Sequence, residues 1–212
     1  MGPWRAVVTL DARGREAGIR MHKTMPSPYR PRRIRLRDGR ELTQRAIVAA
    51  DAAEIVQAFE RLSGDSRYYR FMYHKKQLDS AALQRGVHPQ PGRDFVFVAT
   101  MPAADGIDIV GAAQYVPAGE GNDKTCEFAV TVAEDWRGSG LATRLLASLV
   151  RRARRDGYKT MEGWVIAGNT AMLALARKLD FRIEPVPGDS TTLRVQRALQ
   201  HTPASRPEAR RA

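Results

Sequence analysis

A loop of small residues and one arginine is the feature of this sequence best suited to bind a ligand. Residues 137–142 read Arg-Gly-Ser-Gly-Leu-Ala and lie between an apolar β-type segment and a long helical pattern. Glycines let a backbone approach a ligand closely, and the first amides of a helix have no partners within the helix. The helix dipole favours an anion at the same place. We therefore expect residues 137–143 to hold a phosphate or diphosphate group.

Two common phosphate-binding loops fit this segment poorly. A P-loop continues from its last glycine into Lys and then Ser or Thr, whereas Leu141 and Ala142 follow Gly140. A dinucleotide-binding loop has a third small residue three positions after that glycine, where this chain has Thr143. The acidic residue that such loops usually have at the end of the next strand is also missing. The sequence therefore favours a third kind of phosphate-binding loop.

A glutamate precedes the loop in a segment with the period of a β-strand. Glu127 lies on one face of this segment, opposite an apolar face formed by Cys126, Phe128, Val130 and Val132. A carboxylate in a central strand is poorly placed for solvent, so it needs a function or a partner. Such a group can remove a proton from an amine. The structural alternative is an ion pair with a neighbouring arginine.

The chain has one cysteine, Cys126. In principle it could carry an acetyl-cysteine intermediate, but its place on the apolar face predicts a buried structural thiol. One cysteine can form neither an intramolecular disulfide nor a cysteine-based zinc site. We expect a site without metal and a reducing, cytoplasmic location.

Alternating strand and helix patterns position these residues. Strands are predicted at 33–37, 41–47, 94–100, 108–116, 125–132 and 159–166, and as a last pair around residues 189–190. Helices are predicted after a capping box at Asp51 and Glu54, and at 66–73, from 79, at 139–156 and at 169–179. This order predicts a mixed α/β sheet with helices on both faces.

Basic residues are concentrated in the first 40 positions of the 212-residue chain, which has a formal net charge of +12. We expect a basic, disordered arm at 1–32, a folded domain at 33–199 and a flexible tail at 200–212. A basic arm can bind nucleic acid, but this one lacks the interleaved aromatic residues that stack on bases. Nucleic acid is therefore not an expected partner. A membrane partner is not expected either, since no apolar run approaches the roughly 18 residues of a membrane-spanning helix.

Two motifs together resemble the GNAT superfamily of N-acetyltransferases. The loop at 137–142 resembles the family's Arg/Gln-x-x-Gly-x-Gly/Ala signature. One helix and one strand later, residues 169–181 resemble its Asn-initiated helix that ends in Leu-Gly-Phe. The resemblance covers about residues 33–197 and implies a GNAT-like mixed, mostly antiparallel sheet with helices on both faces. The Arg-Leu-Arg-Asp-Gly-Arg segment at 35–40 and Ser-Arg-Tyr-Tyr-Arg-Phe at 66–71 are more specifically similar to bacterial protein-lysine acetyltransferases.

The resemblance implies a co-substrate, acetyl-CoA, and a role for each motif residue. Backbone groups of two core valines would pair with the pantetheine arm, and the loop would wrap the diphosphate. Asn169 would contact the pantetheine or serve as a plain helix N-cap. Glu127 would be the catalytic general base, acting through a water. The expected cofactor-binding residues are Val130, Val132, Arg137, Gly138, Ser139, Gly140, Leu141, Ala142, Thr143 and Asn169.

The sequence departs from the family pattern at three positions, one of which is Glu134 in place of a common loop proline. Ala176 stands where many members have a tyrosine that protonates the leaving thiolate. The thiolate would then leave unprotonated, or Tyr115 or a water would supply the proton. Asp180 stands where glycine is usual, and aspartate can adopt the left-handed conformation that this position needs.

The sequence thus predicts direct transfer of an acetyl group from acetyl-CoA to an amine, without a covalent enzyme intermediate. A protein lysine is the preferred acceptor, and a small-molecule amine on the same fold is the alternative. A regulatory module that binds acetyl-CoA without turnover is a third interpretation, suggested by Ala176. A nucleic-acid-binding protein that uses the basic arm is the weakest.

Overall fold

The structure is a computed structural model that describes residues 4–10, 16–23, 29–104, 106–119 and 124–199. The chain forms two compact units that divide between Arg30 and Pro31. In the first unit, the arm predicted to be disordered contains two paired antiparallel strands, β1 (Trp4–Leu10) and β2 (Glu16–Lys23). The predicted tail at 200–212 lies outside the described residues.

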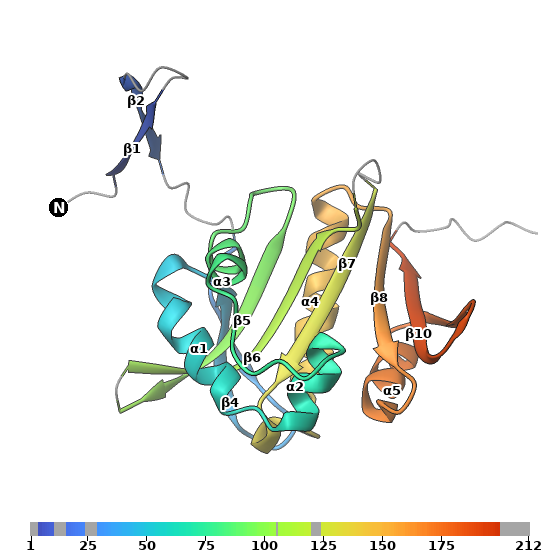
Figure 1. Cartoon of the computed structure of the whole chain (residues 1–212). Helices are drawn as coiled ribbons and strands as arrows, with labels where there is room; N and C mark the ends of the chain where they lie inside the picture. The colour runs from blue at the N-terminus through green and yellow to red at the C-terminus, as the bar shows by residue number, and fades with distance from the viewer. Residues whose placement is uncertain (1–3, 11–15, 24–28, 105, 120–123, 200–212) are drawn as a thin grey trace, which may run out of the picture. The chain divides into compact units, whose positions relative to one another are not determined.

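An eight-stranded sheet forms the second unit, in the order β3-β4-β5-β6-β7-β8-β10-β9 (Figure 1). Neighbouring strands are antiparallel, except that β7 and β8 are parallel. The predicted mixed, mostly antiparallel sheet is therefore confirmed. The strands are β3 (Arg32–Arg35), β4 (Glu41–Ala46), β5 (Phe95–Ala103), β6 (Gly106–Pro117), β7 (Thr125–Val132), β8 (Thr160–Ile166), β9 (Arg182–Val186) and β10 (Asp189–Ala198).

Helices cover both faces of this sheet, as predicted. Three helices, α1, α2 and α3, lie on one face, and the long helix α4 lies on the other (Figure 1). Helix α5 packs beside β9, and Phe181, which follows it, contacts Phe128 of β7. The helices are η1 (Ala49–Asp51), α1 (Ala52–Glu60), α2 (Gly64–Phe71), α3 (Ser80–Val87), η2 (Glu134–Trp136), α4 (Leu141–Arg155) and α5 (Thr170–Lys178). No helix in the described ranges is long and apolar enough to span a bilayer.

The leucine stripe of α4 fixes this helix against the sheet. Leu141, Leu145 and Leu149 are almost fully buried. Gly111 of β6 lies directly beneath the helix, because a Cβ there would come within 3.1 Å of Leu145. This close approach sets the position of the helix start, and with it the position of the glycine loop at the end of β7.

Two local predictions in this unit have opposite outcomes. The capping box at the start of α1 is wrong. The Asp51 carboxylate accepts a hydrogen bond from the Val48 N–H (2.8 Å), and Glu54 accepts one from the Ile109 N–H of β6 (3.0 Å). Asp51 thus closes the preceding turn η1 and Glu54 connects α1 to β6, so neither carboxylate caps the first turn of α1. The left-handed conformation of Asp180 is confirmed by its φ of 56°.

Candidate active site

Strands β7 and β8 separate soon after they begin to pair. Their parallel register ends at the pair Glu127 and Glu162, whereas β7 continues to Val132 and β8 to Ile166. Beyond that pair, the edge of β7 that faces β8 has no strand partner in this register. Backbone groups at such an edge can pair with an extended ligand as with an added strand. Val130 and Val132, the predicted pantetheine contacts, both lie along this stretch.

A cleft of about 710 Å³ occupies this fork. Its lining comes from β7, β8, α2, α5 and the glycine loop. All the predicted cofactor-binding residues line it except Ser139, and the predicted base Glu127 lines it as well. The cleft thus brings together residues from both motifs, which lie about 30 positions apart in the sequence.

The glycine loop has the backbone conformation of an anion cradle. Gly138 and Gly140 have φ values of 76° and 88°, which disfavour any residue with a side chain. Ser139 is buried, and its hydroxyl donates to the Trp136 carbonyl at 2.6 Å. This serine therefore stabilises the turn by a hydrogen bond within it and does not line the cleft. The two glycines and the first turn of α4, which begins at Leu141, line the cleft.

The Arg137 side chain is bound to α2 in this structure. Its guanidinium donates to the Ser66 hydroxyl at 2.5 Å and lies 3.7 Å from the Glu134 carboxylate. Glu134 accepts hydrogen bonds from the Ser63 N–H at 3.0 Å and from the Ser66 hydroxyl at 2.7 Å. These bonds lower the pKa of the Glu134 carboxyl to about 2. The cluster ties the loop to the start of α2, and the Arg137 side chain remains 58% exposed.

Asn169 caps helix α5 and also lies at the cleft. Its Oδ1 accepts a hydrogen bond from the Met172 N–H at 3.1 Å, so its role as the N-cap of α5 is confirmed. The same residue also lines the cleft. Its contact with pantetheine stays a prediction.

Glu127 lies at the point where the strands separate, on the sheet face that α2 covers. Burial raises the pKa of its carboxyl, and the negative charge of Glu162 raises it further, whereas Arg70 lowers it. Glu162 is buried and receives the guanidinium of Arg194 at 2.5 and 3.0 Å. Among the described residues Glu127 forms no ion pair, although the charge of Arg70 acts on it, and Arg194 pairs with Glu162. The ion-pair alternative for Glu127 is therefore not what the geometry favours.

Several other side chains of the cleft were not predicted to belong to it: Arg37, Tyr69, Arg70, Trp164 and Lys178. Arg70 lies in the segment 66–71 that carried the closer resemblance, but its residue type alone gave it no role. The missing information is tertiary, because the helix period does not show that α2 directs this arginine toward β7.

Burial decides whether Tyr115 can act as the proton donor and whether Cys126 can act as a nucleophile. Tyr115 is fully buried and its hydroxyl donates to Asp156 beside α4, so the suggestion that it protonates the thiolate is wrong. Ala176 is also fully buried and does not line the cleft. Cys126 is fully buried as expected, and burial raises the pKa of its thiol to about 12. A thiol with this pKa is not a nucleophile near neutral pH.

Comparisons with known proteins agree with this site. Residues 56–181 match the model of the acetyltransferase (GNAT) family. The acetyltransferase PA5475 of Pseudomonas aeruginosa is 33% identical over 156 residues, which are 74% of this chain and 83% of that protein. An L-methionine sulfoximine/L-methionine sulfone acetyltransferase of Pseudomonas paraeruginosa is 42% identical over 64 residues, 30% of this chain and 37% of that protein.

Solved structures show the same fold. The GNAT domain of S. lividans PAT superposes with a TM-score of 0.73 at 22% identity, over 79% of this chain and 96% of that domain. The yncA protein of Salmonella typhimurium, solved with its cofactor acetyl-CoA, gives a TM-score of 0.60 at 22% identity, over 79% of this chain and 98% of that one. With the family match covering more than half of its length, the chain belongs to the GNAT family and is an acetyl-CoA-dependent N-acetyltransferase.

Proposed function

We propose that this enzyme transfers the acetyl group directly to a primary amine, with Glu127 as the general base. The observation that carries the proposal is the position of Glu127 at the fork. It is the only carboxylate among the described residues that line the cleft, and its pKa is raised. A raised pKa brings a carboxylate closer to the proton affinity that a base needs near neutral pH.

The acetyl-CoA site in this proposal uses backbone more than side chains. The unpaired edge of β7 at Val130 and Val132 would pair with the pantetheine arm. The amides of residues 138–143 would surround the diphosphate at the start of α4. A Cβ at Gly138 or Gly140 would strain the turn, which is why the loop needs glycine there.

The acceptor enters the reaction as an ammonium ion with a pKa of about 10.4 if it is a lysine. Glu127 takes one proton from it, directly or through a water, and leaves a neutral amine. The nitrogen then attacks the thioester carbonyl, the new C–N bond forms and the C–S bond breaks. CoA leaves as a thiolate, and the second proton of the nitrogen is lost as the amide forms. Ala176 has no proton to donate, so the proton lost from the nitrogen would pass through a water to the thiolate.

Two acceptor classes fit this chemistry. A protein lysine is the class that the sequence resemblance favours. A small-molecule amine is favoured by an apolar cavity beside the cleft, and by the L-methionine sulfoximine/L-methionine sulfone acetyltransferases among the relatives.

The test uses the purified protein, radiolabelled acetyl-CoA and a de-acetylated cytoplasmic lysate. Enzyme-dependent label in discrete protein bands would support a lysine acceptor, and label in the small-molecule fraction would support the second class. Glu127→Gln should abolish either product while acetyl-CoA binding persists. An absence of transfer to both fractions, with acetyl-CoA bound, would contradict the proposed turnover.

A further inference from the structure

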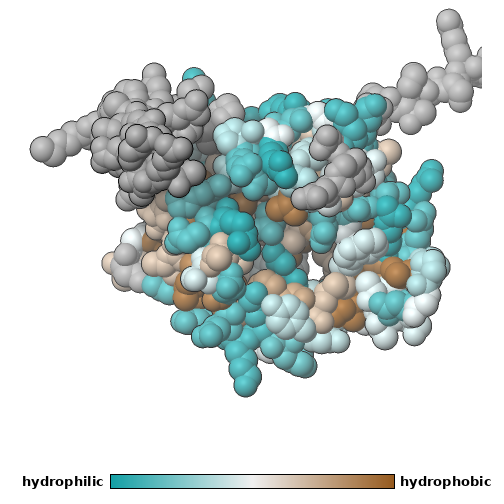
Figure 2. All heavy atoms as spheres, turned by 45° about the horizontal axis from the view of Figure 1, so that its top comes forward, coloured by the Kyte–Doolittle hydropathy of each residue, from teal (hydrophilic) through white to brown (hydrophobic). Residues whose placement is uncertain are grey.

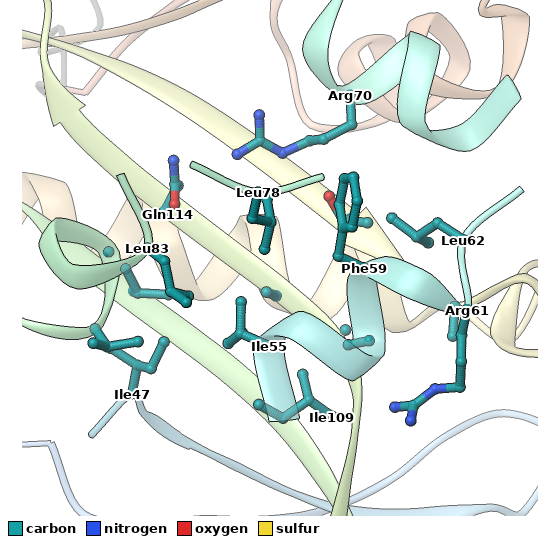
Figure 3. Close-up of a pocket in the computed structure, with 18 of the residues that line it drawn as sticks. Ile47, Ile55, Phe59, Arg61, Leu62, Arg70, Leu78, Leu83, Ile109 and Gln114 are labelled. Atoms are coloured by element: carbon teal, nitrogen blue, oxygen red, sulfur yellow. The ribbon is translucent and has the colours of Figure 1, made fainter. Parts of the chain in front are cut away.

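A second cavity, of about 370 Å³, lies between the sheet and helices α1 to α3 (Figure 3). Its lining is mainly apolar and includes Ile47, Ile55, Phe59, Leu62, Leu78 and Leu83. The volume falls in the range of about 300 to 1,000 Å³ that is usual for small-molecule sites. We call it the apolar cavity, to distinguish it from the cleft.

The apolar cavity adjoins the cleft beside Arg70, whose charge acts on the Glu127 carboxyl. Arg70, Phe71 and Thr131 line both spaces. Thr131 lies on β7 four residues after Glu127, so both side chains are on the same face of the strand. A molecule in the apolar cavity can therefore present one end to Glu127.

The charges around the apolar cavity are positive. None of its described lining residues is acidic, whereas Arg61, Arg70 and Lys75 line it. Arg61 forms ion pairs with Glu54 and Asp108. In the part of the chain that the structure describes, Arg70 forms none, and burial lowers the pKa of its guanidinium while the charge of Glu127 raises it.

An arginine stays charged even when its pKa is lowered, so Arg70 leaves a half-buried cation without a close counter-ion. Such a charge is costly unless an anion approaches it. The Gln114 side chain lies on the same side of the cavity and adds an amide group that can donate and accept hydrogen bonds (Figure 3). Together, the two side chains form a polar end that suits a carboxylate, next to an otherwise apolar space.

We infer that the apolar cavity binds the acceptor, and that this acceptor is a small amine with an apolar body and a carboxylate, such as an apolar amino acid. Its carboxylate contacts Arg70 and Gln114, its apolar group fills the cavity, and its amine faces Glu127. The inference rests on the proposed function, because it names the amine that Glu127 deprotonates. It disfavours a lysine whose ammonium ion ends inside the cavity, because the described lining residues there include Arg70 and Lys75 and no acid, whereas the amine of the proposed acceptor lies outside that lining, at Glu127.

Three probes with the same branched carbon chain test the three parts of this acceptor. L-leucine has the amine and the carboxylate, isoamylamine lacks the carboxylate, and isocaproate lacks the amine. Binding of each to the protein is measured by calorimetry with CoA present, and acetylation of the two amines is followed by release of CoA. We expect leucine to bind and to be acetylated, isocaproate to bind and compete with it, and isoamylamine to bind about ten- to a hundredfold more weakly.

Two variants and a matched control locate the binding. Arg70→Gln should weaken leucine about ten- to a hundredfold and leave isoamylamine unchanged, because only leucine has the carboxylate. Ala112→Phe should exclude both by filling the apolar cavity, since Ala112 lines it and not the cleft. Arg85→Gln removes the same charge from an exposed position on α3 outside both spaces and should change neither. Acetyl-CoA binding to each variant shows that the fold is intact.

Each outcome decides between specific alternatives. Leucine binding that Arg70→Gln does not weaken overturns the inference. So does acetylation of a lysine peptide without any binding of leucine or isocaproate, although the proposed function would then stand. An effect of Ala112→Phe confined to longer acyl-CoA donors would make the cavity an acyl site and overturn its role for the acceptor. Leucine binding without acetylation would support the cavity and contradict the proposed function.

Discussion

Glu127 and Glu162 face each other across the last paired position of β7 and β8, and the charge of Glu162 should therefore set the pH range of the enzyme. The informative perturbation is Glu162→Gln, which removes one negative charge and keeps the size of the side chain. Arg194, which binds Glu162 at 2.5 Å, would then have no carboxylate at this place. Both changes stabilise the ionised form of Glu127 and lower its pKa.

The size of the shift follows from the separation of the two strands. Neighbouring strands lie about 4.8 Å apart, and carboxylates at the ends of paired glutamates are about 6 Å apart. Two unit charges at about 6 Å interact by about 0.7 kcal/mol in water and about 2.8 kcal/mol at an effective dielectric constant of about 20. At about 1.4 kcal/mol for each pKa unit, the range is about 0.5 to 2 units. Arg194 keeps its charge in the variant and does not reduce this effect, so we expect a shift within this range, about 0.5 to 2 units.

The assay is the pH dependence of kcat/KM for the acceptor amine, whose acidic limb reports the pKa of the base in the enzyme. Glu162→Gln should move this limb to lower pH, and Glu60→Gln, an exposed change at the end of α1, should leave it in place. Carbon-13 NMR of the glutamate carboxyls gives the same pKa without turnover, with the Glu127 signal assigned from its loss in Glu127→Gln. A limb that stays fixed, or that moves to higher pH, would refute the electrostatic coupling of the two carboxylates.

Three further predictions follow from the same geometry. Glu127→Gln should lower kcat by about 10² to 10⁴, with unchanged acetyl-CoA affinity in calorimetry; unaltered turnover would remove Glu127 from the mechanism. Gly140→Val should weaken CoA binding and lower the thermal midpoint, because φ is 88° there; wild-type binding would contradict the cradle. The lowered pKa of Glu134, about 2, contributes stability that is present above pH 4.5 and lost as the pH falls toward 2. Glu134→Gln should therefore flatten the acid dependence of urea midpoints in that window, and an unchanged slope would count against it.

Local sequence patterns predicted the elements of the folded domain well, because the signals that define them are short-range. The Asp38-Gly39 turn between β3 and β4, the leucine stripe of α4 and the glycine at its start were all readable from neighbouring residues. Most of the predicted cleft residues were found for the same reason, because the two motifs lie at helix starts, where the sequence signals are short-range. The surface of the folded unit is largely hydrophilic, with smaller apolar areas between the charged ones (Figure 2), as the overall composition suggests.

Predictions failed where an acid or a basic residue has its partner far away in the sequence. Glu54 matches a capping box locally, but its carboxylate accepts a hydrogen bond from the Ile109 N–H, which the sheet places beside it. At the basic end of α4, Arg151, Arg154 and Arg155 are exposed, whereas Arg152 packs over the Phe95 ring of β5 and pairs with Asp156, which the helix pattern alone does not show. In each case the local pattern is satisfied by several arrangements, and the packing of the sheet selects among them.

The fork between β7 and β8 couples the two requirements of acetyl transfer. An unpaired strand edge is needed to hold an extended co-substrate, and a raised carboxylate pKa is needed to deprotonate the amine. Glu127 occupies the last position that still has a strand partner, so it keeps Glu162 beside it while it lines the cleft. One residue earlier or later, at Cys126 or Phe128, a carboxylate would point to the opposite face of the sheet and would not share a face with Glu162. In the proposed mechanism, the place of this glutamate in the register is therefore the feature that would join binding to catalysis.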